Sequence, residues 1–241
     1  MQTFQFYLFL LPLIFAGSMN AQKTVTYNAK DGVVITADMY EMNDTLPWMI
    51  LFHQAGYSRG EYKDMVKRFH KLGYNCMAVD LRSGKEVNGV INQTALDAQK
   101  KGKDTEYLDA EQDVIASIDY LYKKVGNQVV ILGSSYSASL CLKVAVGNTS
   151  VERVIAYSPG EYFGKKLKLK DAIKKLDKPV YVASSAEEKA GCEELMKDVL
   201  TGDKIIYAPA TGGKHGSSAL WKSNANYTDY WISLMMFLDR D

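Results

Sequence analysis

The chain contains 241 residues, of which 47% are hydrophobic and 24% are charged. This composition is typical of a globular protein with a large core, and it excludes a disordered, collagen-like or coiled-coil chain. The 29 basic and 28 acidic residues leave a formal charge of +1. Because no strong overall field would attract nucleic acid, we expect no nucleic-acid partner. The cysteines are few and widely spaced, and we expect buried thiols at Cys76, Cys141 and Cys192.

The first residues have the pattern of an export signal. Residues 4–16 form an apolar run that is about as long as a signal-peptide core and shorter than the ~20 residues of a membrane span. Small residues follow, and we expect cleavage after Ala21, with cleavage after Ser18 as the alternative. The mature chain, 22–241, is then a single secreted or periplasmic domain with no membrane association. Residues 1–21 contain no Lys or Arg, so a retained membrane anchor stays open as an alternative.

The rest of the chain alternates between short apolar runs and helical patterns. An Asp31-Gly32 turn separates the first two β-rich segments and predicts an opening hairpin. The later runs suit strands that are buried on both faces of a parallel sheet. We expect strands at 24–27, 33–40, 48–52, 76–79, 129–132, 154–157, 180–183 and 205–207, and helices at 61–71, 110–123, 137–146, 171–176, 188–200 and 227–238. This alternation predicts a three-layer α/β domain with a mostly parallel central sheet of about eight strands and helices on both faces.

One long polar stretch, 83–107, has no clear periodicity. It contains Gly84, Gly89 and Gly102 and is longer than ordinary connections. We expect it to form a loop or short cap that shapes the mouth of an active site.

The most informative motif joins the strand at 129–132 to the following helix. The segment from Gly133 to Ser137 reads Gly-Ser-Ser-Tyr-Ser. In a nucleophile elbow the positions two before and two after the nucleophile must be small, and Gly133 and Ser137 meet this condition. The pattern therefore places Ser135 at the apex, with its hydroxyl at the carboxyl end of the sheet. The start of the helix behind it offers backbone amides to an oxyanion.

Two further segments extend this pattern. His53-Gln54-Ala55-Gly56 follows a buried strand, and Gly73-Tyr74 is followed by Asp80-Leu81-Arg82-Ser83-Gly84. Together with the elbow, these motifs resemble the α/β-hydrolase family in its dienelactone-hydrolase-like branch, over roughly residues 31–238. The resemblance implies an α/β-hydrolase fold. It also implies that the backbone amides of Tyr136 and Ala55 form the oxyanion hole. Gln54 stands where the family usually has Gly, so the Gln54 amide is an alternative to that of Ala55.

A serine nucleophile needs a base, and the base needs a carboxylate to orient it. His53 ends the oxyanion strand and His70 lies within a predicted helix, which leaves His215. This histidine lies after the last strand in a Gly-rich loop, where the family places its catalytic histidine. The family pattern puts the acid at Glu188, although Ser185 replaces the usual Gly and Glu replaces Asp. Glu187 and Glu161 are alternative acids, and a Ser-His dyad is a further possibility.

These residues predict an exported serine hydrolase that cleaves an ester or related acyl bond through an acyl-enzyme. The substrate would be a small-molecule ester or acyl compound, and no metal or nucleotide fingerprint implies a cofactor. The sequence does not determine the acyl group or the oligomeric state. Two other functions stay open: a catalytically inactive ligand-binding protein on a hydrolase scaffold, suggested by the irregular acid position, and a small serine peptidase that shares the elbow and triad.

Overall fold

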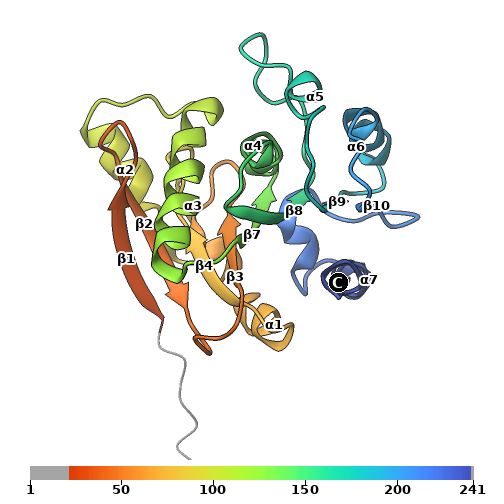
Figure 1. Ribbon diagram of the computed structural model, residues 1–241, viewed down its shortest axis with the longest axis horizontal. Coiled ribbons are helices and arrows are strands. Elements are labelled where there is room, and N and C mark those ends of the chain that lie inside the picture. Colours follow the sequence, from red (N-terminus) through yellow and green to blue (C-terminus); the bar gives the residue numbers. More distant parts are fainter. Residues whose placement is uncertain (1–21, 240–241) are drawn as a thin grey trace, which may run out of the picture.

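A computed structural model describes residues 22–239 of the chain (Figure 1). One sheet has the strand order β1-β2-β4-β3-β7-β8-β9-β10. Strand β2 pairs antiparallel with β1 and with β4, and every other neighbouring pair in the sheet is parallel. The strands are β1 (Lys23–Asn28), β2 (Val34–Tyr40), β3 (Trp48–Phe52), β4 (Asn75–Val79), β7 (Val129–Ser134), β8 (Val151–Tyr157), β9 (Val180–Ala183) and β10 (Lys204–Tyr207). The predicted sheet is thereby confirmed. The predicted signal peptide lies outside the described residues.

Helices cover both faces of the sheet because alternate strand residues point to opposite sides. In β3, Ile50 and Phe52 belong to one core cluster, and Met49 and Leu51 belong to the other. The first face carries α2 (Gln93–Lys100), α3 (Glu111–Val125), α4 (Tyr136–Ala145), α5 (Leu169–Ala172) and α6 (Lys189–Met196). The second carries α1 (Val66–Lys71) and α7 (Tyr227–Leu238). In Figure 1, α4 lies above the sheet, and α1 and α7 lie below it. Between residues 22 and 239, no helix has the length and hydrophobicity needed to cross a bilayer.

Part of the stretch that was expected to be irregular has regular structure. Residues 83–107 contain a small hairpin of β5 (Glu86–Val87) and β6 (Val90–Ile91), followed by α2. The Asn92 side chain caps α2 by accepting the Ala95 amide at 2.8 Å. Two side chains of α2 accept backbone N–H groups of β2. The Thr94 hydroxyl accepts the Thr36 amide, and the Asp97 carboxylate accepts the Val34 amide. This segment therefore covers the β2 side of the sheet, and the loop that reaches the candidate site is short.

The same end of the sheet is braced by charged side chains. Arg82 is 2% exposed and binds both Asp113 and Asp31, which joins the loop after β4 to α3 and to the turn between β1 and β2. Asp80 accepts the Arg59 guanidinium at 2.6 Å. A buried charge must be paired and hydrogen-bonded to be tolerated, and these contacts meet that condition. Asp80 and Arg82 thus have structural roles in this fold.

The three cysteines are buried and form no disulfide in the described chain. Cys141 lies inside α4 and is fully buried. Burial raises the pKa of its thiol far above the ordinary value, so a thiolate does not form there near neutral pH.

Candidate active site

Ser135 lies in a sharp turn between β7 and α4. Its backbone has φ 60° and ψ −122°, a conformation rare for a residue with a side chain. The Ser135 amide donates to the carbonyl of Tyr157 at 2.7 Å, and the Ser137 hydroxyl donates to the carbonyl of Phe52 at 2.8 Å. A Cβ on Gly133 would lie 2.5 Å from the Ala138 nitrogen, so only glycine fits there. The small residues identified in the sequence are therefore the ones this turn requires.

The structure brings Ser135, His215 and Glu188 together from three separate loops. His215 follows β10 and directly precedes the short helix η3 (Gly216–Leu220), whereas Glu188 lies just before α6. His215 Nε2 is 2.7 Å from Ser135 Oγ, and His215 Nδ1 is hydrogen-bonded to Glu188 Oε1. An ionised carboxylate only accepts hydrogen bonds. It therefore accepts a hydrogen bond from Nδ1–H, which keeps the proton on Nδ1 and leaves Nε2 free to accept the serine proton. The His215 side chain is 44% exposed, so a substrate can reach it.

Glu188 is oriented by a second serine that the sequence analysis did not identify. The Ser158 hydroxyl donates to Glu188 Oε2 at 2.7 Å and accepts the Gly216 amide at 2.9 Å. The Ser185 amide donates to the same carboxylate oxygen at 3.1 Å. Ser158 follows β8 and has a positive φ of 51°. Its position at a strand end next to the elbow strand is the only sequence signal that could have suggested it.

The ionisation states of the pair follow from these contacts. Burial opposes ionisation of Glu188, but hydrogen bonds from His215, Ser158 and the Ser185 amide outweigh it and lower the pKa of this carboxyl to about 2. The hydrogen bond to Glu188 raises the pKa of His215, against the opposing effect of partial burial. Glu188 is thus an anion throughout the neutral range, and His215 is a stronger base than a free imidazole.

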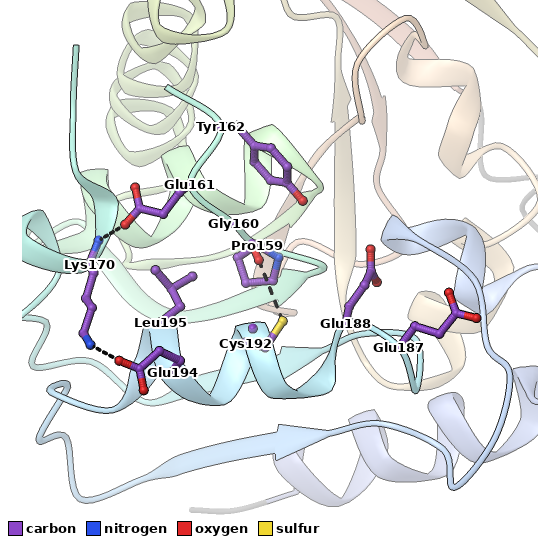
Figure 2. Close-up of a pocket in the computed structure, with 11 residues that line it drawn as sticks. Pro159, Gly160, Glu161, Tyr162, Lys170, Glu187, Glu188, Cys192, Glu194 and Leu195 are labelled. Carbon is purple, nitrogen blue, oxygen red and sulfur yellow. Dashed lines mark hydrogen bonds and ion pairs between the residues drawn. The ribbon is translucent and has the colours of Figure 1, made fainter. Parts of the chain in front are cut away.

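The two alternative acids line the same pocket as Glu188 but do not contact His215. Glu161 accepts the backbone amides of Leu169 and Lys170 at 2.8 and 2.9 Å, which caps the start of α5. Figure 2 shows Glu161 turned toward Lys170, on the opposite side of a pocket from Glu188. Glu187 is exposed and its side chain makes no hydrogen bond to His215 within the described part of the chain. Only Glu188 of the three candidates touches the histidine.

The two amides expected to hold an oxyanion follow neighbouring strands of the sheet, β3 and β7. Tyr136 is the first residue of α4, and the first N–H groups of a helix have no acceptor within the helix. Ala55 lies in the loop after β3, next to β7 in the sheet. The Gln54 amide, which was the alternative donor, instead donates to Glu61 at 2.8 Å. In this structure the Gln54 amide is thus already paired, which favours Ala55 as the donor.

A pocket of about 400 Å³ lies next to Glu188 (Figure 2). Its wall near the serine includes Tyr162, whose hydroxyl donates to the carbonyl of Ser158 at 2.9 Å. Burial raises the pKa of this phenol to about 12, so it stays protonated. Tyr107, at the end of the predicted loop, stacks on Tyr136 with ring centroids 4.6 Å apart. Tyr162 thus lines the pocket, and Tyr107 packs on the residue that follows the serine.

The strand order, the elbow and the placement of the histidine and acid after later strands define an α/β-hydrolase. Solved structures agree with this fold. An esterase, Pf2001, from Pyrococcus furiosus has a TM-score of 0.73 at 15% identity, with 91% of this chain and 92% of that chain covered. A dienelactone hydrolase from Anabaena variabilis gives 0.68 at 14% identity, covering 90% and 96%. An acylaminoacyl peptidase from Pyrococcus horikoshii gives 0.65 at 14% identity, covering 91% of this chain but 41% of that chain.

The family follows from the sequence match. The model of the dienelactone hydrolase family matches residues 22–201. No curated protein sequence matches the chain at a significant level. The chain therefore belongs to the dienelactone hydrolase family, which is a family of hydrolases, as the sequence motifs predicted.

Proposed function

We propose that this protein is a serine hydrolase that cleaves a carboxylic ester or related acyl bond of a small molecule through an acyl-enzyme. The observation that carries the proposal is the continuous hydrogen-bonded chain from Ser135 through His215 to Glu188. This arrangement of nucleophile, base and orienting carboxylate is the one that serine hydrolases on unrelated folds share. The family match and the esterase fold neighbours support the hydrolytic chemistry.

In the proposed first step, His215 Nε2 takes the Ser135 hydroxyl proton while Oγ attacks the substrate carbonyl carbon. The amides of Tyr136 and Ala55 hold the negative charge that develops on the carbonyl oxygen. Glu188 stabilises the imidazolium that forms. The tetrahedral intermediate then breaks its bond to the leaving oxygen, which takes the proton from His215, and the acyl group stays on Ser135.

In the second step, a water molecule replaces the alcohol. His215 removes a proton from this water as its oxygen attacks the acyl carbon, and the same two amides hold the oxyanion. Collapse breaks the bond to Ser135 Oγ, which recovers its proton from His215. The pocket beside Glu188, with Tyr162 in its wall, is the place we assign to part of the substrate.

The test is covalent labelling with a fluorophosphonate probe, which reacts with an activated serine. We expect one adduct on residues 22–241, located at Ser135 by peptide mapping, and none on Ser135→Ala. The control is Ser223→Ala, which removes an exposed hydroxyl that binds Lys214 and should leave labelling unchanged. Absence of any adduct on the unmodified protein across the pH range would contradict the proposal and favour a ligand-binding protein on the same scaffold.

We also propose that the protein is exported, because residues 1–21 have the apolar core and small-residue ending of a signal peptide. We expect the chain recovered from the medium or the periplasm to begin at Gln22. Intact mass measurement distinguishes this from cleavage after Ser18, and a full-length chain retained in the membrane fraction would show that the segment is an anchor.

A further inference from the structure

Glu61 is buried beneath the loops of the candidate site. It belongs to the short helix η1 (Arg59–Tyr62) and is 1% exposed. Its Oε2 accepts the backbone amide of Gln54 at 2.8 Å. Its Oε1 accepts the hydroxyls of Ser134 at 2.9 Å and Ser217 at 2.5 Å. A carboxylate in such a position costs free energy unless several donors satisfy it, and here three donors do so.

Each of these donors is a close chain neighbour of a residue in the proposed mechanism. Gln54 precedes Ala55, Ser134 precedes Ser135, and Ser217 follows His215 by two residues. The Ser217 amide also donates to Ser134 Oγ at 2.8 Å, which links the nucleophile segment directly to the histidine loop. One carboxylate thus ties together the oxyanion, nucleophile and histidine segments, although it touches none of the reacting atoms.

The direction of the hydrogen bonds makes this link depend on the charge of Glu61. All three partners donate, which suits an ionised carboxylate with two accepting oxygens. A protonated Glu61 carries an O–H donor that none of its three donating partners accepts unless a serine hydroxyl turns around, and its protonated oxygen is a weaker acceptor. The Gln54 amide cannot reverse, because a backbone N–H only donates. Protonation therefore disturbs the serine hydroxyls that hold the nucleophile and histidine segments.

The surroundings place this protonation near neutral pH. Burial raises the pKa of Glu61 to about 7, against hydrogen bonds from Ser217, the Gln54 amide and Ser134 and the attraction of His215. The negative charge of Glu61 contributes to the raised pKa of two buried phenols, Tyr62 and Tyr136. The groups that share a surface pocket with Glu61 on its outer side are Lys63, Asp64, Lys67, Arg68 and Lys222. Glu61 is ionised above its raised pKa and neutral below it.

We propose that Glu61 is a positioning residue whose ionised carboxylate holds the nucleophile, oxyanion and histidine segments in the reactive arrangement, and whose protonation loosens it. This inference rests on the proposed serine hydrolase function. It predicts that two protonations, of Glu61 and of His215, each inactivate the site as the pH falls. A purely structural carboxylate would leave only the histidine visible in the pH profile.

The experiment measures the second-order rate constant of fluorophosphonate labelling of Ser135 as a function of pH. For the unmodified protein we expect the logarithm of this rate to fall with a limiting slope of two below neutral pH. Glu61→Gln keeps the size of the side chain but replaces one acceptor oxygen by a donor. We expect it to lower the rate on the alkaline plateau by up to about 100-fold, as for a small misplacement of reacting groups, and to reduce the acid slope to one.

Asp64→Asn is the matched control, because it removes an exposed carboxylate three residues away and should change neither rate nor slope. Ser217→Ala is a second variant that keeps the charge: it removes one donor, raises the pKa of Glu61 further and should move the steep limb to higher pH. If circular dichroism and thermal unfolding show that Glu61→Gln does not fold, the pH profile of Ser217→Ala tests the role of Glu61 in its place.

The outcomes separate the inference from the function on which it rests. The role of Glu61 would be overturned if the unmodified protein is labelled with an acid slope of one and if Glu61→Gln or Ser217→Ala has the same rate and pH profile. The hydrolase proposal would then stay intact. An unmodified protein with no adduct at Ser135 would overturn the proposed function, and the inference with it.

Discussion

Replacing His215 or Ser135 with alanine is expected to lower kcat for an activated ester by about 10⁴- to 10⁶-fold. His215 Nε2 is the group placed to accept the Ser135 proton, and Glu188 lies on the far side of the imidazole, so removing His215 leaves the serine without its base. Without Ser135 there is no nucleophile to form the acyl-enzyme. Because the residues of a triad act as a unit, the double variant should be about as impaired as either single variant.

The measurement is the rate of p-nitrophenyl ester hydrolysis, with thermal unfolding as a check on the fold. His70→Asn is the control for the histidine: His70 lies in α1, where its Nε2 is 3.2 Å from the carbonyl of Tyr40, away from the serine. We expect this variant to retain full activity. Full activity in both Ser135→Ala and His215→Ala would show that the reaction, if there is one, uses another site.

The second large effect is expected at Glu188. Changing it to glutamine keeps the shape of the side chain, but the amide can present a donor to His215 Nδ1 and stabilise the wrong tautomer. The imidazolium also loses its counter-charge. The equivalent change in a serine protease triad costs about 10⁴-fold in kcat with the geometry intact, and we expect a loss of that order here.

The adjacent residue provides a stringent control for this prediction. Glu187→Gln makes the same chemical change one position earlier, on an exposed side chain that lines the pocket but does not contact His215, and its loss in kcat should be far smaller than that of Glu188→Gln. Ser158→Ala should have an intermediate effect, since it removes one of the donors to Glu188 but not the carboxylate. A loss in Glu187→Gln with none in Glu188→Gln would reverse the assignment.

Much of the fold could be predicted because the signals are local. Strands buried on both faces need near-continuous apolar runs, and β3, β4, β7 and β9 have them. The hairpin of β1 and β2 follows from its Asp-Gly turn. By contrast, α2 was missed because its sequence, QTALDAQK, is mostly polar. It is helical because Asn92 caps it and because Thr94 and Asp97 bond to the backbone of β2, contacts that no local pattern reveals.

The predicted helix at 61–71 shows the same limit. The structure divides it into η1 and α1, with Met65 as the N-cap residue of α1. In a continuous helix Glu61 would be one more surface carboxylate beside Lys63 and Asp64. Its burial depends on Gly60, where a Cβ would lie 2.3 Å from the Val87 carbonyl, and on serines from two distant loops.

The sequence by itself determined the class of fold, the elbow and the serine at its apex, because a tight strand-to-helix turn demands small residues at set spacings. By elimination it also determined the histidine. Only the tertiary structure decided that Glu188 is the carboxylate in contact with His215. It also showed that the Gln54 amide already donates to Glu61, and that Ser158 donates to Glu188. Most of these choices depend on how loops far apart in the sequence meet at the carboxyl edge of the sheet, and the spacing of residues along one chain segment carries no information about that meeting.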